Sequence, residues 1–313
     1  MGMSGADGPT DRAESIATIH AALDAGITLL DTGDFYGSGH NELLIAEALR
    51  GRKREDVVIS LKFGALRSPT GQYGGGHDTR PASMRNFLTY SLVRLGTDYV
   101  DIYRPSRLDR DVPIEETIGA IAEMVERGYV RQIGLSEMSA ETVRRASAVH
   151  PIVDLQIEYS LLTRGIEDAI LPACRELGIG ITAYGVLARG IFGGELTRAR
   201  HGGSSMPRFK GENLERNLAL ANALRVVAAA KGATLGQIAI AWVLHQGADI
   251  MPVIGTRKRP QLADALGALD VKLDAADLAA IEAAVPKGAA AGARYGELQM
   301  LELDSERAAE VRA

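Results

Sequence analysis

Short apolar and β-branched runs recur along the chain at intervals that suit the strands of a buried sheet. Seven such runs occur, at residues 28–31, 56–62, 98–104, 129–136, 153–158, 179–184 and 249–255. The segments between them have helical spacing; for example, Ile118, Ile121 and Val125 fall on one face of a helix. The sequence therefore predicts strands and helices that alternate throughout.

Glycine and proline mark the boundaries of these segments. Glycine stands just past five helical runs, where a left-handed residue commonly ends a helix: Gly26, Gly51, Gly96, Gly128 and Gly178. Pro81 and Pro113 lie near the starts of two others. Repeated strand-helix units imply a parallel sheet, because parallel neighbours need a crossover connection.

A closed barrel is favoured over an open sheet, because no G-x-G-x-x-G motif follows an early strand. We predict a single (β/α)8 TIM-type domain over residues 1–313, with Met1–Ser4 as a stub of the first strand. Long loops at 64–79 and 186–213 follow strand ends, where barrels place their active-site loops. An extra helix is predicted over 274–285, before a tail rich in glycine, alanine and charge.

Composition excludes several classes of function. Hydrophobic residues make up 46% of the chain and charged residues 24%, which is typical of a globular protein with a large core. The formal net charge is −5 and the basic residues are scattered, so a nucleic-acid partner is not expected. Cys174 is the only cysteine, which fits a reducing compartment. With no long apolar run and no metal-ligand spacing, we expect a cytoplasmic protein without membrane or metal.

Polar side chains stand at the carboxyl ends of the predicted strands. They are Asp31, Lys62, Arg104, Ser136, Gln156, Glu158 and Tyr184. In a barrel all these ends meet at one rim, and residues at that rim are typically functional. Any one of them could instead be a satisfied polar group that closes a strand, but several together favour a functional site.

The strongest local signal is the segment Asp31-Thr-Gly-Asp-Phe-Tyr36-Gly, followed by Lys62 at the end of the next strand. Neighbouring strand ends lie close, so Asp31 and Lys62 can pair while the loop carries Tyr36 over them. Free tyrosine has a pKa of about 10, and an adjacent ammonium lowers it towards a usable general acid. In this hypothesis a reduced nicotinamide supplies hydride to a carbonyl carbon and Tyr36 protonates its oxygen. Lys62 tunes Tyr36, and Asp31 keeps Lys62 charged.

The stretch GITLLDTGDFYGSGHNELLIAEAL, with VVISLKFG after it, resembles the signature of the aldo-keto reductase family. The similarity extends over nearly the whole chain, through segments such as GYVRQIGLSEMSAETVRRA and MPVIGTRKRPQLADALGAL, and is greatest to bacterial and fungal members acting on aldehydes, such as the pyridoxal-reductase-like subgroup. The resemblance implies NADP(H)-dependent reduction of a small aldehyde or ketone to an alcohol, with Asp31, Tyr36 and Lys62 catalytic.

The fourth catalytic position departs from the family pattern. Ser106 stands where the family usually has histidine. A serine hydroxyl can hydrogen-bond a carbonyl oxygen but cannot carry the charge of an imidazole. Alternatively, Ser106 only caps its loop.

The resemblance also implies a cofactor site. Ser136, Glu137 and Gln156 would contact the nicotinamide carboxamide, with Glu137 where asparagine is commoner, and Tyr184 would stack on the ring. The pyrophosphate and adenosine would follow Leu187, Arg189, Gly190, Gly255, Thr256, Arg257, Gln261 and Asp264. Arg257, beside Lys258 and Arg259, favours NADP over NAD, because a 2′-phosphate suits a guanidinium fork. The alternative is that this basic run is a solvated helix start.

Family members normally have a hairpin and a full first strand before the position of Met1. We therefore expect a truncated first strand whose edge is covered by the N-terminus, the tail or a second subunit in a homo-oligomer. Two other functions stay open: an NADP-binding sensor with little turnover, and a lyase that forms a Schiff base on Lys62. Asp31 argues against the lyase, because a carboxylate keeps the lysine protonated.

Overall fold

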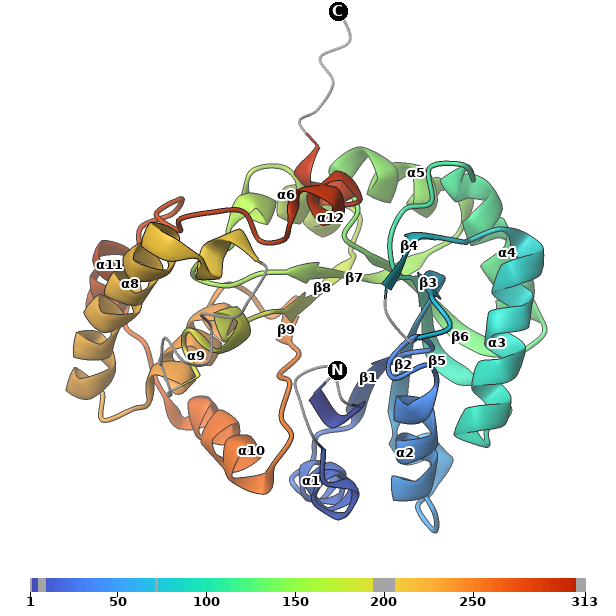
Figure 1. Cartoon of the computed structure of the whole chain (residues 1–313), viewed down its shortest axis with the longest axis horizontal. Coiled ribbons are helices and arrows are strands. Elements are labelled where there is room, and N and C mark those ends of the chain that lie inside the picture. Colours follow the sequence, from blue (N-terminus) through green and yellow to red (C-terminus); the bar gives the residue numbers. More distant parts are fainter. Residues whose placement is uncertain (1, 5–9, 71–72, 194–205, 308–313) are drawn as a thin grey trace, which may run out of the picture. The chain divides into compact units, whose positions relative to one another are not determined.

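In the computed structural model the described residues are 2–4, 10–70, 73–193 and 206–307. All seven predicted strands are present in them. They are β1 (Leu29–Gly33), β2 (Val58–Phe63), β5 (Val100–Pro105), β6 (Val130–Ser136), β7 (Ile152–Glu158), β8 (Gly180–Tyr184) and β9 (Ile250–Pro252). They form a parallel sheet with strand order β1-β2-β5-β6-β7-β8-β9 (Figure 1). This confirms the predicted α/β fold class of (β/α)8 type.

Helices separate the strands as the apolar spacing predicts. They are α1 (Arg12–Asp24), α2 (His40–Ala48), α3 (Pro81–Leu95), α4 (Ile114–Glu126), α5 (Ala140–Val149), α6 (Ile170–Glu176), α8 (Gly211–Ala230), α9 (Leu235–His245), α10 (Arg259–Leu266), α11 (Ala275–Ala284) and α12 (Glu297–Leu301). On α4 the predicted face is buried at Ile118 and Ile121. The predicted glycine ending is clear after α3, where Gly96 has φ 64° and its N–H bonds the Leu92 carbonyl.

Within the described ranges, no single helix is long and apolar enough to cross a membrane. Helices α8 and α9 meet that test only when taken together, and they are bent by 87° relative to each other.

The chain forms two compact units. The first comprises residues 1–155, 176–179 and 255–262, and the second comprises residues 156–175, 180–254 and 263–313. Strand β7 belongs to both, because its first part lies in the first unit and its end in the second. A single domain over residues 1–313 stays a prediction.

The strand register in the first unit sorts side chains onto two faces. Asp31 pairs with Ser60 across β1 and β2, and Lys62 pairs with Arg104 across β2 and β5. Because side chains alternate along a strand, these four residues share one face, called here the polar face. The opposite face carries Phe63 and Tyr103, whose rings stack with centroids 4.4 Å apart and are fully buried. The Tyr103 hydroxyl donates to the Met84 carbonyl on α3, so this apolar face packs against α3.

Two sequence predictions of backbone form need correction. Gly2–Ser4 is a short 3-10 helix and not a strand. Its Ser4 hydroxyl lies 3.0 Å from both His40 Nδ1 and Asn41 Nδ2 of α2, and this polar partner at the start of α2 replaces a sheet neighbour. The predicted loop 64–79 contains a hairpin, β3 (Ala65–Arg67) and β4 (Tyr73–His77). Its glycines hide the usual strand pattern.

The other predicted loop, 186–213, is built from short helical turns where it is described. The turns are η4 (Ala188–Gly190) and η5 (Pro207–Phe209), and α8 begins at Gly211. Residues 194–205 of this loop lie outside the described residues. The remaining 3-10 helices are η2 (Arg54–Asp56), η3 (Gly165–Glu167), η6 (Gly267–Asp270) and η7 (Asp304–Glu306).

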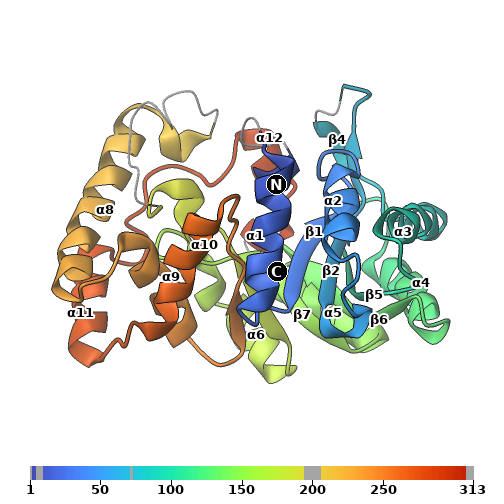
Figure 2. The ribbon, with the colours of Figure 1, turned by 90° about the horizontal axis from the view of Figure 1, so that it is seen from below.

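In the second unit, α8 packs beside α11 (Figure 2). Helix α11 is the predicted extra helix, and Asp274 caps its first turn with Asp277 in a capping box. The segment after α11 is tied to α8 by the fully buried amide of Asn217. Asn217 Nδ2 donates to the carbonyls of Arg208 (3.0 Å) and Ala291 (2.9 Å), and its Oδ1 accepts from the Ala291 N–H (2.8 Å).

We expect Asn217→Ala to lower the free energy of unfolding by about 2–4 kcal/mol, because it leaves three backbone groups without their partner, and the two of Ala291 are buried. Asn213 on the same helix donates one hydrogen bond, to the Pro207 carbonyl, so Asn213→Ala is the matched control and should cost about 1 kcal/mol or less. Urea unfolding of both variants measures the difference. Equal losses would contradict an anchoring function for Asn217.

Candidate active site

A buried ion pair joins β1 and β2 on the polar face. Lys62 Nζ lies 2.5 Å from Asp31 Oδ2, and the two side chains are only 5% and 7% exposed. The other carboxylate oxygen, Asp31 Oδ1, accepts a hydrogen bond of 2.8 Å from the Ser60 hydroxyl. Removing either charge would leave its partner buried and uncompensated, which is costly in a folded protein.

The turn after β1 places Tyr36 against this pair. The Asp34 N–H bonds the Lys62 carbonyl and the Tyr36 N–H bonds the Gly33 carbonyl, each at 3.0 Å, so the turn is fixed to both strands. Lys62 Nζ lies 5.1 Å from the centroid of the Tyr36 ring. Phe35 packs edge-on against the same ring, with centroids 4.8 Å apart. The structure therefore brings Asp31, Lys62 and Tyr36 together.

The pKa of Tyr36 differs from the sequence expectation in its direction. Burial removes water from the phenol and raises its pKa above the ordinary value of 10.0, and this is the largest effect. The charge of Lys62 lowers the pKa, but the charge of Asp31 raises it again. The net direction is upward, so Tyr36 is held in its protonated, proton-donating form.

Two buried hydroxyls lie at the ends of the next two strands of this unit. Ser106 follows β5 and is 2% exposed, and Ser136 ends β6 and is 1% exposed. The backbone fixes Ser106, whose N–H bonds the Phe63 carbonyl at 2.9 Å. Neither hydroxyl oxygen has a hydrogen-bond partner within the part of the chain that the structure describes. Because buried hydroxyls are normally paired, both suit the polar groups of a ligand.

The predicted adenosine-side residues of the first unit lie where α10 begins. Gln261 Oε1 accepts from the Arg257 N–H at 2.9 Å, which fixes the backbone at the start of the helix. Among the described residues, and apart from its chain neighbours, no atom lies within 4 Å of where a Cβ at Gly255 would stand, and Thr256 and Arg257 are partly buried. Arg259 was expected to add to the positive charge here, but it pairs with Glu14 of α1 at 2.9 Å. Its charge is therefore largely balanced within the protein.

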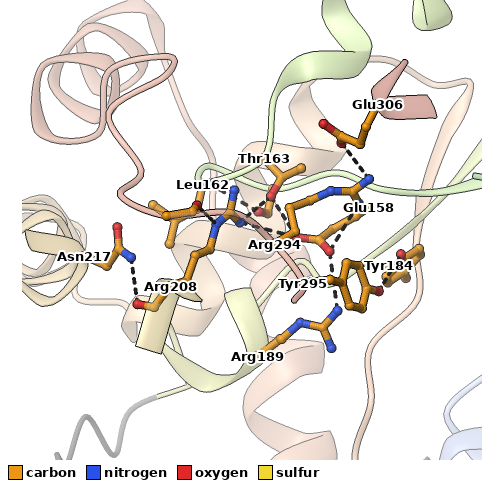
Figure 3. A network of polar contacts seen from close by, with 12 residues as sticks. Glu158, Leu162, Thr163, Tyr184, Arg189, Arg208, Asn217, Arg294, Tyr295 and Glu306 are labelled. Atoms are coloured by element: carbon orange, nitrogen blue, oxygen red, sulfur yellow. Dashed lines mark hydrogen bonds and ion pairs between the residues drawn. The ribbon is translucent and has the colours of Figure 1, made fainter. Parts of the chain in front are cut away.

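In the second unit a polar network surrounds the end of β7 (Figure 3). Glu158 is 3% exposed and forms ion pairs with Arg294 (3.3 Å), Arg208 (3.5 Å) and Arg189 (3.6 Å). Of the predicted cofactor residues, Arg189 thus lies in this network. Its guanidinium carbon is 4.5 Å from the centroid of the Tyr295 ring.

Tyr184, at the end of β8, contacts the segment after α11 that carries Arg294 and Tyr295. Its hydroxyl lies 3.0 Å from the hydroxyl of Tyr295. Arg294 anchors this tail through its pair with Glu158, and it also pairs with Glu306 further along the tail at 2.7 Å. Sequence reasoning missed Arg294 and Tyr295, although an adjacent basic and aromatic residue in a tail rich in glycine and alanine was an available signal.

The other predicted residues of the second unit have local partners. Leu187 accepts from the N–H groups of Gly190 and Phe192, which closes the turn after β8. Gln156 is buried on β7. Asp264 accepts from the Thr234 hydroxyl at 3.0 Å, so its carboxylate supports the start of α9.

Backbone strain gathers in the loops that carry these residues. The non-glycine residues with positive φ in the described ranges are Ser38, Glu137, Ala188 and Arg189. Such conformations are costly for residues with a Cβ, and they commonly cluster at functional sites. Each of the four lies within two positions of a predicted site residue or is one.

The described residues form a parallel α/β fold of (β/α)8 type with a buried Lys62–Asp31 pair beside Tyr36. Comparison with known proteins gives the family. A model of the Aldo/keto reductase family matches residues 1–286. The probable aldo-keto reductase 1 of Glycine max is 45% identical over 302 residues, covering 94% of this chain and 86% of the relative. The chain belongs to the aldo/keto reductase family of oxidoreductases. The bacterial and fungal subgroup stays a prediction.

Solved structures agree with this family. A glycerol dehydrogenase of Gluconobacter oxydans is 28% identical, with a TM-score of 0.79 over 90% of this chain and 87% of that chain. An aldo/keto reductase of Klebsiella pneumoniae, solved with NADP and acetate, is 26% identical, with a TM-score of 0.70 over 88% of this chain and 86% of that chain.

Asp34, two positions before Tyr36, is a carboxyl group with an unusual pKa. Burial, followed by the negative charge of Glu42, raises the pKa of Asp34 from 3.8 to about 7, against the opposing effects of the Gly64 N–H and Arg94. Asp34 Oδ1 has no hydrogen-bond partner among the described residues. The folded state therefore binds this proton more tightly than the unfolded chain does.

Between about pH 4 and pH 7 the free energy of unfolding should fall by up to about 4 kcal/mol as the pH rises. The tighter binding of the Asp34 proton by the folded state stabilises the protein fully at low pH, and this contribution is lost as the pH rises through the raised pKa. We expect Asp34→Asn, which mimics the protonated acid, to remove that fall and to stabilise the protein at pH 8. Urea unfolding across pH 4–8 measures both effects.

Asp78→Asn is the control of opposite sign. A hydrogen bond from Arg80 lowers the pKa of Asp78 to about 2, so its contribution is present above pH 4 and the variant should lose stability across the whole range. A wild type and an Asp34→Asn variant with the same dependence on pH would refute the assignment for Asp34.

Proposed function

We propose that the protein is an NADP(H)-dependent oxidoreductase that reduces aldehydes or ketones to alcohols with Tyr36 as the general acid. The observation that carries the proposal is the buried Lys62–Asp31 pair, with Lys62 Nζ 5.1 Å from the Tyr36 ring centroid. Family membership supports the class of reaction, and the NADP bound by the Klebsiella pneumoniae relative supports the cofactor.

The protein side chains act on the carbonyl oxygen. A raised pKa keeps Tyr36 protonated, so its hydroxyl can donate to that oxygen. As negative charge develops there, the proton moves from the phenol to the oxygen, and Lys62 stabilises the phenolate that is left. Asp31 is the ion-pair partner of Lys62. A bound reduced nicotinamide supplies the hydride.

Ser106 orients the substrate in this proposal. Its hydroxyl is buried and without a partner in the described part of the chain, so it can donate to the carbonyl oxygen. Unlike histidine, it brings no group that titrates near neutral pH.

The proposed cofactor residues are considered unit by unit. In the first unit they are Ser136, Gly255, Thr256, Arg257 and Gln261, and in the second they are Gln156, Tyr184, Leu187, Arg189, Gly190 and Asp264. The Ser136 hydroxyl, which has no hydrogen-bond partner among the described residues, supports contact with a carboxamide, and the Arg257 guanidinium supports recognition of a 2′-phosphate. The lyase alternative is disfavoured because Lys62 Nζ forms an ion pair with Asp31 at 2.5 Å, whereas Schiff-base formation needs a free amine.

Tyr36→Phe should lower kcat for NADPH oxidation with small aromatic and aliphatic aldehydes by about 100-fold or more, because it removes the general acid. NADPH binding, measured by fluorescence titration, should be retained. Tyr90→Phe is the control, because Tyr90 is an exposed tyrosine of α3 and should leave turnover unchanged.

Other outcomes would select the rival functions. Tight NADPH binding by the wild type, with no turnover across a broad aldehyde panel, would replace the reductase by a sensor. Borohydride trapping of a carbonyl compound on Lys62 would indicate the lyase.

Arg257→Gln should lower the preference of kcat/KM for NADPH over NADH by about 10- to 100-fold, since it removes a charged partner of the 2′-phosphate. Arg259→Gln removes a neighbouring guanidinium that is already paired with Glu14, and should change the preference little. Steady-state kinetics with both cofactors tests this. Equal changes in the two variants would show a general charge effect and not a contact made by Arg257.

A further inference from the structure

A continuous chain of polar contacts runs from the Lys62–Asp31 pair into the interior of the first unit. Arg104 on β5 is fully buried, and its NH2 group donates to the Ser60 hydroxyl at 2.9 Å. Ser60 in turn donates to Asp31 Oδ1 at 2.8 Å. The NH1 group of Arg104 donates to Asp154 Oδ2 on β7 at 3.0 Å.

The chemistry of the donors fixes the direction of these hydrogen bonds. A guanidinium has only donors, so Ser60 must accept from Arg104. The single hydroxyl proton of Ser60 is then directed to Asp31. A hydroxyl that accepts from a cation is also polarised into a stronger donor. Arg104 therefore determines, through Ser60, how the Asp31 carboxylate is held.

Strand β6 leaves room for the side chains of Arg104 and Asp154 only because residue 134 is glycine. A Cβ at Gly134 would lie 2.6 Å from Asp154 Oδ1 and 3.1 Å from the guanidinium carbon of Arg104. Stability alone explains the buried Arg104–Asp154 ion pair poorly, because apolar side chains of similar volume commonly stabilise a core as well as such a pair or better. A function in holding Asp31 would explain why these two charges are buried.

We propose that Ser60 and Arg104 are positioning residues of the active site. Together they hold Asp31 ionised with Oδ2 towards Lys62, which keeps the Lys62 ammonium beside Tyr36. This inference rests on the proposed reductase function for its kinetic consequence, but its effect on the Asp31 carboxyl group can be measured without turnover.

The first test is Ser60→Ala, which removes the donor to Asp31 and leaves the Arg104–Asp154 pair in place. The carboxyl carbon signal of Asp31, labelled with carbon-13 and assigned with Asp31→Asn, should titrate about one pH unit higher than in the wild type, because the carboxylate has lost a hydrogen bond. The pH at which kcat falls on the acid side of its pH profile should rise by the same amount. At low pH kcat should therefore be about tenfold lower than in the wild type, while KM for NADPH is unchanged.

The second test addresses Arg104 without leaving a lone buried charge. The double variant Arg104→Met with Asp154→Asn removes both charges. It should move the Asp31 titration in the same direction as Ser60→Ala but by less, because Ser60 keeps its hydroxyl and can still donate to Asp31. Adding Ser60→Ala to it should give no more than the shift of Ser60→Ala alone, because Arg104 acts on Asp31 through Ser60. Arg54→Met is the control: Arg54 pairs with Asp101 on the same strand β5, away from Asp31, so its loss should lower stability and leave both pH profiles unchanged.

The outcomes separate this inference from the proposed function. An Asp31 signal that titrates alike in the wild type and Ser60→Ala would overturn the positioning function, whatever the activity. A loss of stability with unchanged pH dependence would do the same. A wild type without turnover would remove the reductase proposal, while the Asp31 titration would still decide the function of Ser60 and Arg104.

Discussion

The burial of one ion pair, between Lys62 and Asp31, is the constraint on which the candidate site depends. Two charges that are 5% and 7% exposed each lose much of their hydration, which costs several kcal/mol per ion unless close partners replace the water. The parallel register provides those partners. Asp31 stands opposite Ser60 and Lys62 opposite Arg104, so the alternation of a strand puts all four on the same face.

The pair also determines what the loop after β1 can do. Burial would leave the Tyr36 phenol a poor acid, and the Lys62 charge partly offsets that effect. Hydrogen bonds from the loop to the ends of β1 and β2 keep the ring near Lys62. The same burial raises the pKa of Asp34, so one dehydrated loop contains a phenol and a carboxyl group that both favour their protonated forms.

The second unit meets a similar electrostatic demand with different residues. Glu158 is buried and its charge is shared by three arginines, one of which, Arg294, is as buried as the carboxylate (Figure 3). Because Tyr295 follows Arg294, anchoring the tail at Glu158 also brings a hydroxyl to Tyr184. Asn217 supports the same segment from α8. The position of Tyr184 thus depends on residues more than a hundred positions further along the chain.

Local pattern in the sequence determined the seven strands, the helices between them, the glycine endings and the family. It also predicted the approach of Asp31, Lys62 and Tyr36, because two neighbouring strand ends and the short loop after one of them carry all three. Periodicity indicates where the strands lie and which face is buried. That information was enough to predict that these three residues approach one another.

Tertiary structure decided the remainder. Arg259 pairs with Glu14 across 245 positions, and Arg294 with Glu158 across 136, and no local pattern encodes such partners. The upward direction of the Tyr36 pKa, the 3-10 turn at Gly2–Ser4 and the link from Arg104 through Ser60 to Asp31 were likewise decided by packing. The physical reason is that desolvation and ion pairing depend on every group packed around a charge, whereas a sequence pattern specifies only the neighbours along the chain.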